Sequence, residues 1–441
     1  MQDQKPNQYD VIIVGGGIAG LTAAAYLAKE KHHILLVEKL EKCGGLVNTF
    51  QHNGFTFEGG VRAIEDSGVL FPMLRDLGIE LDLVKNTISL GVEDQVIQIQ
   101  SEADVDQYQD FLISLYPESE TDIKAIIREI RKIMTYMDIQ YGIDNPVFMD
   151  LRDRDYLMNT VMPWALRFFT TVPKINQIKG PVNEYLQQFT RNQSLLDIIS
   201  QHFFQETPAF FALSYLKIYL DYYYPKGGTA KLVDALMEII NETGCEVRTN
   251  TTITQINPQH RTLSDQEGNE YAYRQLVWAA DQKTLYDRVD VDGLENNRLR
   301  QVVSQRRETL KKLRGNDSVL TVWLETDLAP QYFKDIATEH FFYTPDKIGQ
   351  SQAGSIPLGE DREIVENWLK QYLSFTTYEI SIPVLRDASM APAGKTGLIV
   401  SVLFDYSFAK QVEAQGWYAE MKDFVAQKMI AMLDDSIYPG L

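Results

Sequence analysis

The sequence predicts an α/β protein in which a mostly parallel sheet is interrupted by a mainly helical insert and followed by a mixed α+β domain. Two observations predict this arrangement. A strand, a glycine-rich turn, a helix and a second strand follow one another within residues 9–38. Strands that alternate with helices return after residue 224, beyond a long stretch of helical pattern. Because such alternation is typical of a parallel sheet, we expect the two separated stretches to join in one sheet.

The N-terminal unit contains every element of a dinucleotide-binding βαβ motif. Val11–Val14 is an apolar run, as a strand covered on both faces requires. The stretch Leu21–Ala28 is typical of a helix with small residues on the face toward the sheet. A second apolar run, Ile34–Val37, leads into Glu38, about twenty residues beyond the glycines. This context on both sides of the glycine turn favours a Rossmann-like cofactor domain.

The glycine-rich turn predicts how the pyrophosphate of a dinucleotide is held. Gly15 makes the tight turn, Gly17 lets the backbone approach the pyrophosphate, and Gly20 lets the helix pack closely against the strand. The first helical residues, Ile18 and Ala19, present N–H groups and the positive end of the helix dipole to the phosphates. The alternative is a strand–helix turn that binds no ligand.

The adenosine half of the cofactor is expected at the end of the second strand. Glu38 can accept hydrogen bonds from both ribose hydroxyls there. A 2′-phosphate would meet a like charge, so we expect a non-phosphorylated adenosine. Lys39, the next residue, and Val247, in a later strand, are assigned to the cofactor site in general.

Two double-glycine pairs indicate which dinucleotide is bound. Gly44–Gly45 and Gly59–Gly60 are joined by a short apolar hairpin, and this pattern resembles the FAD-binding two-dinucleotide superfamily. The resemblance implies that the first pair contacts the flavin side of the dinucleotide and that the second lies near the isoalloxazine ring. It implies that Leu46, Val61 and Arg62, which adjoin these pairs, belong to the FAD site. The alternative for each pair is an ordinary hairpin turn with positive φ.

Further motifs narrow the resemblance to the phytoene desaturase family, which includes carotenoid desaturases, carotenoid isomerases and retinol saturases. Pro225–Gly228 and Val277–Asp281 match this family in order, and the match covers residues 9–286. It is weaker over Ser381–Asp387 and Leu398–Leu403. These motifs specify no substrate.

The resemblance implies an FAD-dependent oxidoreductase that acts on a hydrophobic polyene or isoprenoid. The flavin would carry the chemistry, while the protein orients the substrate in a dry apolar channel. Arg62 is the best candidate for a polar group near the flavin, although a structural salt bridge explains it equally well, and no catalytic base is assigned. Two alternatives remain open. One is a non-catalytic prenyl- or lipid-binding protein on the same fold, as in the Rab GDP-dissociation inhibitors, and the other is an amine oxidase-like flavoenzyme.

Composition excludes several classes of function. The formal charge of −19 and the isoelectric point near 4.8 argue against binding to nucleic acid, whose phosphates need a basic surface. The N-terminus has no apolar signal-peptide core, and no apolar run reaches the roughly 18 to 20 residues of a membrane span. Two distant cysteines suggest neither a disulfide framework nor a metal site. We therefore expect a cytoplasmic protein, with a hydrophobic peripheral contact with a membrane left open for substrate access.

The expected domain boundaries follow these patterns. Residues 1–100 form the first part of the FAD-binding domain, residues 101–224 the helical and aromatic-rich insert, residues 225–290 the second part of the FAD-binding domain, and residues 291–441 the mixed substrate domain. Strands are expected over 318–324, 378–383 and 397–404 in the last domain, with a final helix from about residue 416 to residue 433. Most aromatic residues of the insert should form its core, and some should line an apolar cavity.

The C-terminus departs from the resemblance. Relatives close the FAD domain with a final glycine-containing strand–helix segment that covers the isoalloxazine, whereas this chain stops at Leu441 soon after a helical stretch. We therefore expect the 441 residues to be a C-terminally truncated form of a longer protein. An exposed helix end and weak or labile flavin binding should follow. If the chain instead holds FAD stoichiometrically, another segment must cover the ring.

Overall fold

The first sheet joins the two separated stretches of the chain, as expected. The computed structural model describes residues 7–150, 152–315 and 317–441. Six strands pair in the order β10-β2-β1-β13-β12-β11. Their bounds are β1 Asn7–Val14, β2 Ile34–Val37, β10 Glu246–Arg248, β11 Ile253–Asn257, β12 Thr262–Asp265 and β13 Glu270–Trp278. β1 pairs in parallel with both β2 and β13, so strands more than two hundred residues apart lie side by side.

The sheet has a hydrophobic core on each of its two faces. α1 (Ile18–Lys29) and α11 (Ala230–Glu242) pack on one face, together with α2 (Leu70–Leu77). β11, β12 and α12 (Gln282–Arg288) contribute to the core on the other face. β2 is buried at all four positions, which explains its continuous apolar sequence. The carboxyl ends of β1 and β2 therefore meet beside the glycine turn.

The second sheet is mixed and has the strand order β14-β17-β16-β15-β7-β8. Its strands are β14 Ser318–Thr326, β17 Thr396–Phe404, β16 Tyr378–Ser381, β15 His340–Thr344, β7 Ile88–Val92 and β8 Gln95–Ile99. The three strands expected from the sequence are β14, β16 and β17, whereas β15 was not anticipated. Residues 88–99 pair here rather than in the first sheet, so sheet membership changes before the boundary expected at residue 100.

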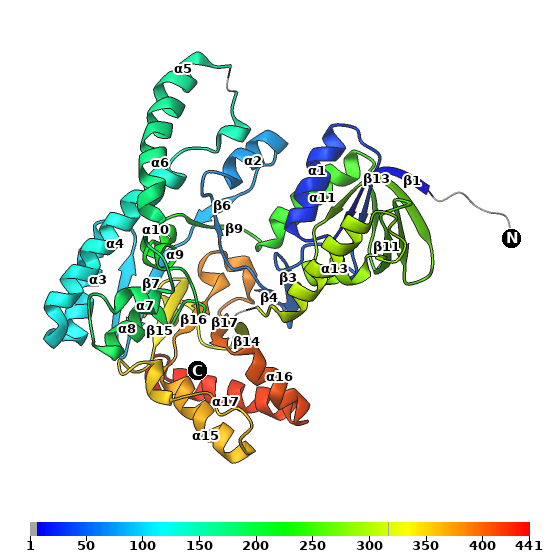
Figure 1. Ribbon diagram of the computed structural model, residues 1–441. Coiled ribbons are helices and arrows are strands. Elements are labelled where there is room, and N and C mark those ends of the chain that lie inside the picture. The colour runs from blue at the N-terminus through cyan, green and yellow to red at the C-terminus, as the bar shows by residue number, and fades with distance from the viewer. Residues whose placement is uncertain (1–6, 151, 316) are drawn as a thin grey trace.

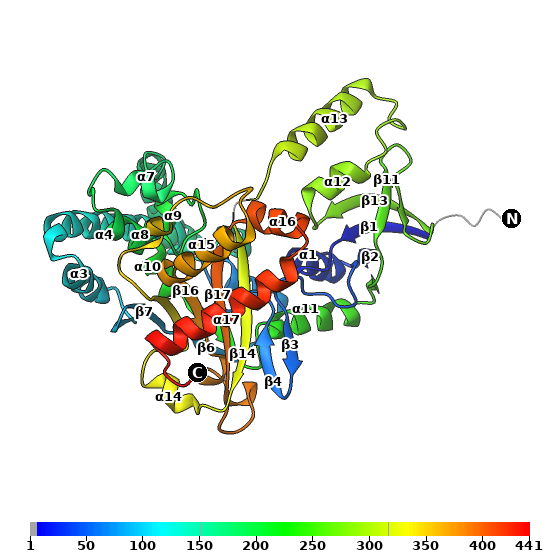
Figure 2. The ribbon, with the colours of Figure 1, turned by 90° about the horizontal axis from the view of Figure 1, so that it is seen from below.

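Helices from the C-terminal part of the chain cover this sheet. Figure 2 shows α15 (Arg362–Phe375) and α17 (Tyr418–Ser436) along it, and their buried side chains share one core with its strands. Two shorter helices, α14 (Pro330–Lys334) and α16 (Tyr406–Ala414), complete this part. The long helix α13 (Asn297–Lys312) follows α12 in the sequence and precedes β14, the first of these C-terminal strands.

The insert is largely helical, and its core continues onto β7, β8 and β15 of the second sheet. Its helices are α3 Asp104–Leu115, α4 Glu120–Tyr141, α5 Arg154–Tyr156, α6 Met162–Ile175, α7 Val182–Leu186, α8 Gln193–Ser200, α9 Ala209–Leu213 and α10 Tyr215–Tyr219. Seven apolar side chains of α4, from Ile123 to Met137, recur at helical spacing and are buried. Figure 1 shows the insert on the side of the molecule opposite the first sheet, with α5 and α6 projecting outward.

Short strands connect the two halves of the molecule. The hairpin of β3 (Thr49–His52) and β4 (Phe55–Glu58) follows the first double-glycine pair, as expected, and touches β17 through Phe55 and Phe57. A third small sheet has the order β5-β9-β6, with bounds β5 Ile64–Glu65, β9 Tyr222–Pro225 and β6 Leu83–Lys85. These strands carry the chain from the glycine loops to the second sheet.

The turn after α17 is packed against the second sheet's core through one buried aromatic side chain. After α17 the chain turns, and the Tyr438 side chain is fully buried with its ring centroid 4.9 Å from that of Phe333. The exposed helix end expected from the sequence is therefore wrong, because a buried aromatic ring fixes this turn. Among the described residues, no helix is long and apolar enough to cross a membrane.

Candidate active site

The three glycines of the first turn have different structural roles. Gly15 adopts φ +111°, and a Cβ there would come within 2.6 Å of the Ala279 carbonyl oxygen. A Cβ on Gly20 would overlap the carbonyl oxygen of Gly15. Gly17, in contrast, has an extended backbone that any residue can adopt, and a Cβ there would meet nothing within 4 Å. The chain itself requires Gly15 and Gly20, while Gly17 faces open space in front of the turn.

This open space lies at the N-terminus of α1. The first N–H groups of a helix have no partner within the helix, and the helix dipole adds positive potential there. Ile18 and Ala19 supply two of these groups, and no acidic side chain stands in the first turn of α1. The turn therefore fits a pyrophosphate, which would accept these hydrogen bonds in the space left by Gly17.

Glu38 lies beside this turn and accepts hydrogen bonds from two backbone N–H groups. Its Oε2 accepts a hydrogen bond from the Gly16 N–H at 2.6 Å, and its Oε1 accepts one from the Leu40 N–H at 2.9 Å. Each carboxylate oxygen has further lone pairs, so Glu38 can also accept from ribose hydroxyls. The sequence predicted only the ribose role. Val247 lies on the neighbouring strand β10, opposite Leu36, and the side chain of Lys39 is exposed.

The loop Gly44–Gly45 packs directly on the glycine turn. Both residues have positive φ, at +126° and +59°. The Gly44 N–H donates to the Gly16 carbonyl at 2.7 Å, and a Cβ on Gly45 would lie 3.3 Å from the Gly17 Cα. The loop is thus a turn that needs glycine and, at the same time, a neighbour of the predicted cofactor site.

At the second pair, Gly59–Gly60, glycine is required for a different reason than at Gly44–Gly45. Neither residue has positive φ, so the hairpin-turn interpretation is wrong for this pair. A Cβ on Gly59 would overlap the Asn48 side chain, and one on Gly60 would lie 2.5 Å from the Leu46 carbonyl oxygen. The Val61 N–H donates to this Leu46 oxygen at 2.9 Å. Close approach of two backbone segments therefore excludes side chains here.

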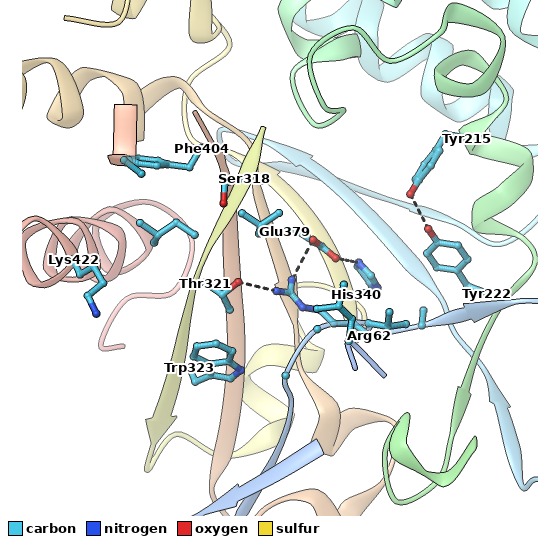
Figure 3. A pocket seen from close by; sticks show the side chains of 18 of the residues that line it. Arg62, Tyr215, Tyr222, Ser318, Thr321, Trp323, His340, Glu379, Phe404 and Lys422 are labelled. Carbon is cyan, nitrogen blue, oxygen red and sulfur yellow. Dashed lines mark hydrogen bonds and ion pairs between the residues drawn. The ribbon is translucent and has the colours of Figure 1, made fainter. Parts of the chain in front are cut away.

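Beyond this contact lies a pocket of about 780 Å³ (Figure 3). Leu46 and the run from Gly59 to Ala63 form one wall, and strands of the second sheet, the insert and α17 form the others. Much of the lining is apolar or aromatic, including Phe211, Val319, Leu320, Trp323, Phe404 and Met421. The pocket thus brings the residues predicted near the isoalloxazine together with the second sheet.

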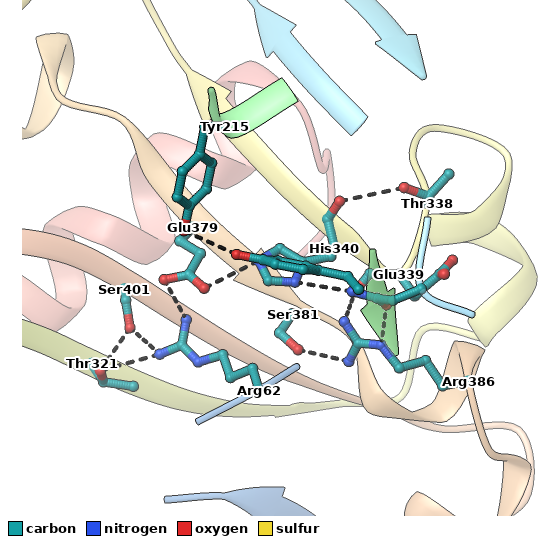
Figure 4. A network of polar contacts seen from close by, with 12 residues as sticks. Arg62, Tyr215, Thr321, Thr338, Glu339, His340, Glu379, Ser381, Arg386 and Ser401 are labelled. Carbon is teal, nitrogen blue, oxygen red and sulfur yellow. Dashed lines mark hydrogen bonds and ion pairs between the residues drawn. The ribbon is translucent and has the colours of Figure 1, made fainter. Parts of the chain in front are cut away.

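A charged network stands in the wall of this pocket (Figure 4). Arg62 is 8% exposed, and its Nη1 lies 3.1 Å from the Glu379 Oε2. Its Nη2 donates to the Ser401 hydroxyl and, at 3.4 Å, to the Thr321 hydroxyl. Glu379 Oε1 lies 3.1 Å from Nε2 of the buried His340. Arg62 is therefore both a salt-bridge residue and part of the pocket wall.

The network fixes the protonation of its members. Burial opposes ionisation of Glu379, but the Arg62 charge and the His340 hydrogen bond outweigh it and lower the pKa of this carboxyl to about 2. Burial lowers the pKa of His340, so its imidazole is neutral near pH 7. Asn86 Nδ2 donates to His340 Nδ1 at 3.3 Å, which leaves the Nε2 proton to Glu379. Glu379 is thus ionised, and its charge is compensated.

A second buried arginine supports this arrangement from behind. Arg386 donates through Nε to the Asn86 side-chain oxygen at 2.6 Å and through Nη1 to Ser381 at 2.8 Å. Its guanidinium also lies over the Tyr224 ring, 4.8 Å from the centroid. Because Asn86 holds His340, Arg386 orients the network without lining the pocket.

The aromatic insert contributes to the pocket as well as to its own core. Phe211, Tyr215 and Tyr222 line the pocket, whereas Tyr219 and Phe203 belong to the core of the insert. The Tyr215 and Tyr222 hydroxyls are 2.9 Å apart. Burial raises the pKa of Tyr215 to about 12, so it remains a neutral phenol. Both sequence-based interpretations of these aromatic residues are therefore correct for different members.

Sequence reasoning missed the polar network around Arg62. Thr321, His340, Glu379 and Ser401 come from four different strands of the second sheet. Each is a polar residue in a strand rich in apolar residues, and that is the only signal the sequence offers. Their convergence depends on strand order and register, which no local pattern reveals.

Comparisons with known proteins identify the family of this chain. The family model for flavin containing amine oxidoreductases matches residues 18–402. Prolycopene isomerase 1, chloroplastic, from an Oncidium hybrid cultivar is 22% identical over 99% of this chain and 71% of its own length. All-trans-retinol 13,14-reductase from Homo sapiens is 24% identical over 58% of this chain, which spans only 43% of that relative.

A solved structure shows the same fold. The oxidoreductase from Methanosarcina mazei superposes with a TM-score of 0.60 at 13% identity, over 98% of this chain and 85% of that one. The fold, the glycine turn and the family match together define the class of the protein. This chain belongs to the flavin-containing amine oxidoreductase family, and its cofactor is FAD.

Proposed function

We propose that this protein is an FAD-dependent oxidoreductase whose substrate is a hydrophobic polyene or isoprenoid. One observation carries the proposal: the large pocket adjoins the Gly59–Arg62 segment and is walled mainly by aromatic and aliphatic side chains. Two relatives support it, because their names refer to prolycopene and to all-trans-retinol. When bound, FAD supplies hydride chemistry, for which the protein needs to provide orientation and a dry site.

The side chains of the pocket fit this role. The apolar wall would exclude water and align an extended hydrocarbon chain. Arg62 supplies a fixed positive charge at one side, held by Glu379, Thr321 and Ser401. Neutral His340 donates a hydrogen bond from Nε2 to Glu379 and holds that carboxylate in place. These groups position and polarise the substrate. Glu379 is too well stabilised as an anion to act as a base.

The same network argues against an amine substrate. An ammonium group in this pocket would have to compete with Arg62 for Glu379, which is already ionised and paired. Replacing a guanidinium that has several partners by a substrate amine would leave the buried Arg62 uncompensated. We therefore place the amine oxidase-like activity second, although the family model carries that name.

The non-catalytic alternative is disfavoured by the glycine turn. A scaffold that binds only lipid would gain nothing from open space at Gly17 or from a carboxylate held at the end of β2. The visible absorption spectrum of the purified protein separates the two ideas. A bound flavin band is expected, and a colourless protein that takes up no added FAD would favour the scaffold.

Binding measurements with matched variants test the substrate class. Val319 lines the pocket and is 44% exposed, so Val319→Trp should fill free space without disturbing the core. We expect FAD-loaded wild type to bind a carotenoid or retinoid dispersed in detergent micelles, and Val319→Trp to bind it at least about tenfold more weakly. Val147→Trp, at an exposed site outside the pocket, should bind like wild type.

Two results would overturn this proposal. One is equal polyene binding by the Val319→Trp and Val147→Trp variants, since the pocket would then not be the binding site. The other is reduction of the bound flavin by a panel of mono- and diamines without any response to polyenes. Peripheral contact with a membrane, which would give access to such substrates, is not supported by the comparisons and stays a prediction.

A further inference from the structure

We propose that α6 and the π-helical turn before it, Leu157–Val161, form a docking surface for the headgroup region of a lipid bilayer. Four large apolar side chains on this helix are exposed by 48% to 74%. They are Met158, Met162, Leu166 and Phe169, which we call the outer stripe. Spacings of three and four residues put them on one side of the helix. This inference stands on the helix alone and does not require the substrate proposed above.

The opposite side of the helix is already occupied. Trp164 donates from Nε1 to the Ile139 carbonyl of α4 at 2.6 Å. The Phe168 ring lies 4.9 Å from the Trp164 ring, centroid to centroid, and Thr171 is buried. α6 is thus apolar on both sides, but only its inner side is covered by protein. Figure 1 shows it projecting beyond the rest of the insert.

The charge of this segment indicates which kind of partner the docking surface binds. From residue 156 to residue 183 the chain contains no Asp or Glu, although 61 of its 441 residues are acidic. The same stretch contains three cations, Arg167, Lys174 and Lys179. A helix with Phe, Leu and Trp together with Lys and Arg is the type that lies in a membrane interface, especially one with anionic lipid. The net charge of −19 makes a locally basic surface of this kind a favourable point of contact.

A second copy of the chain fits this surface less well. Stable protein–protein interfaces use about 20–30 residues on each side. The outer stripe offers four large side chains along a single projecting helix. A bilayer needs no matching partner surface and accepts a single helix that lies flat within its headgroup region. We therefore commit to the lipid surface.

The position of α6 also relates to the pocket. Its anchor, Ile139, belongs to α4, and Met137 and Tyr141 of the same helix line a second cavity of about 330 Å³. Glu65 lines both this cavity and the pocket beside Arg62. Docking through α6 would therefore bring the bilayer to the side of the molecule where this second cavity lies, which Glu65 separates from the pocket.

Vesicle binding tests the inference with the FAD-loaded full chain. Vesicles of phosphatidylcholine with and without phosphatidylglycerol are sedimented with wild type, with Leu166→Glu/Phe169→Glu, and with Val302→Glu. Val302 is a matched control, because it is an exposed apolar residue on another basic helix, α13. We expect wild type to bind, more strongly to vesicles with the anionic lipid, and the double variant to bind at least about tenfold more weakly. Val302→Glu should bind like wild type.

Circular dichroism and retained FAD establish that the double variant is folded. Its activity on a substrate dispersed in detergent should equal that of wild type, so failure here is distinct from failure of the proposed function. Three results would overturn the inference. They are no vesicle binding by wild type, equal binding by the double variant, and loss of binding in Val302→Glu instead. A wild type that is dimeric in light scattering, while the double variant is monomeric and neither binds vesicles, would assign the stripe to a second copy.

Discussion

Gly17 offers a substitution whose effects on folding and on cofactor binding should separate. Its backbone has φ −73° and ψ 176°, which a residue with a side chain adopts without strain. A Cβ there would meet no atom within 4 Å, so Gly17→Ala fits the folded chain, and the larger Gly17→Val extends into the same free space. That space lies at the N-terminus of α1, where the pyrophosphate of FAD is predicted.

The structure sets the expected magnitudes. Without FAD, Gly17→Ala should change the free energy of unfolding by no more than about 0.5 kcal/mol, as for other surface substitutions. A side chain in the pyrophosphate space should cost two or more charge-assisted hydrogen bonds, or roughly 3–6 kcal/mol of binding free energy, which is about 10²- to 10⁴-fold in Kd. Gly20→Ala is the contrasting variant, because its Cβ would overlap the Gly15 carbonyl oxygen. It should destabilise the apoprotein itself by about 1–3 kcal/mol or more.

Urea unfolding of the apoproteins and FAD titration followed by flavin fluorescence measure the two effects separately. Gly17→Ala should unfold like wild type and bind FAD weakly, with Gly17→Val weaker still. Full flavin occupancy in Gly17→Val would show that the pyrophosphate does not lie at this turn. Strong destabilisation of apo Gly17→Ala would refute the reasoning that this glycine serves the ligand rather than the fold.

The charged groups give three further predictions. Arg62→Met should lower the free energy of unfolding in urea by about 1–3 kcal/mol, which is less than for a fully buried pair because the Glu379 side chain is 35% exposed. Adding Glu379→Gln to Arg62→Met should restore most of this loss. An unchanged loss in the double variant would contradict the pairing of Arg62 with Glu379. Since the pKa of Glu379 is lowered from 4.5 to about 2 in the folded protein, its contribution to stability is complete above about pH 4.5 and is lost as the pH falls toward 2. The Glu379→Gln variant should therefore lose less stability than wild type across that window, and parallel pH profiles would argue against the assignment. Glu38→Ala should weaken FAD binding in calorimetry by one or two hydrogen bonds of about 1.5–3 kcal/mol each, and Glu38→Gln by less; unaltered affinity in Glu38→Ala would remove Glu38 from the cofactor site.

The parts of the fold that depend on local pattern could be predicted from the sequence. The continuous apolar runs of β1 and β2 and the glycines between them identify the first sheet, because a strand buried on both faces allows no polar positions. The helical periodicity of α4 likewise predicts which side chains are buried. These features are encoded within a few neighbouring residues.

The parts that depend on long-range pairing could not be predicted. β7 and β8 follow the first domain in sequence, yet β7 pairs with β15, some 250 residues later, a register that no local signal specifies. The reason for Gly59 and Gly60 was also hidden, because it is the approach of residues 46–48 and not a turn with positive φ. Arg62 could be singled out beside its glycines, but Glu379 became a site residue only once β16 was placed.

The central claim is that this chain uses FAD to act on a polyene in the pocket beside Arg62. Anaerobic mixing of the FAD-loaded protein with a carotenoid or retinoid in micelles tests it most directly, with the flavin spectrum and the chromatographic profile of the polyene followed together. The account predicts that oxidised FAD takes up two electrons as the polyene is desaturated, or that FAD reduced beforehand with dithionite isomerises the polyene or gives its two electrons to it. The Val319→Trp variant should slow this FAD-dependent reaction by at least about tenfold. Polyenes that stay unchanged over a broad panel, while an amine reduces the bound flavin, would contradict it.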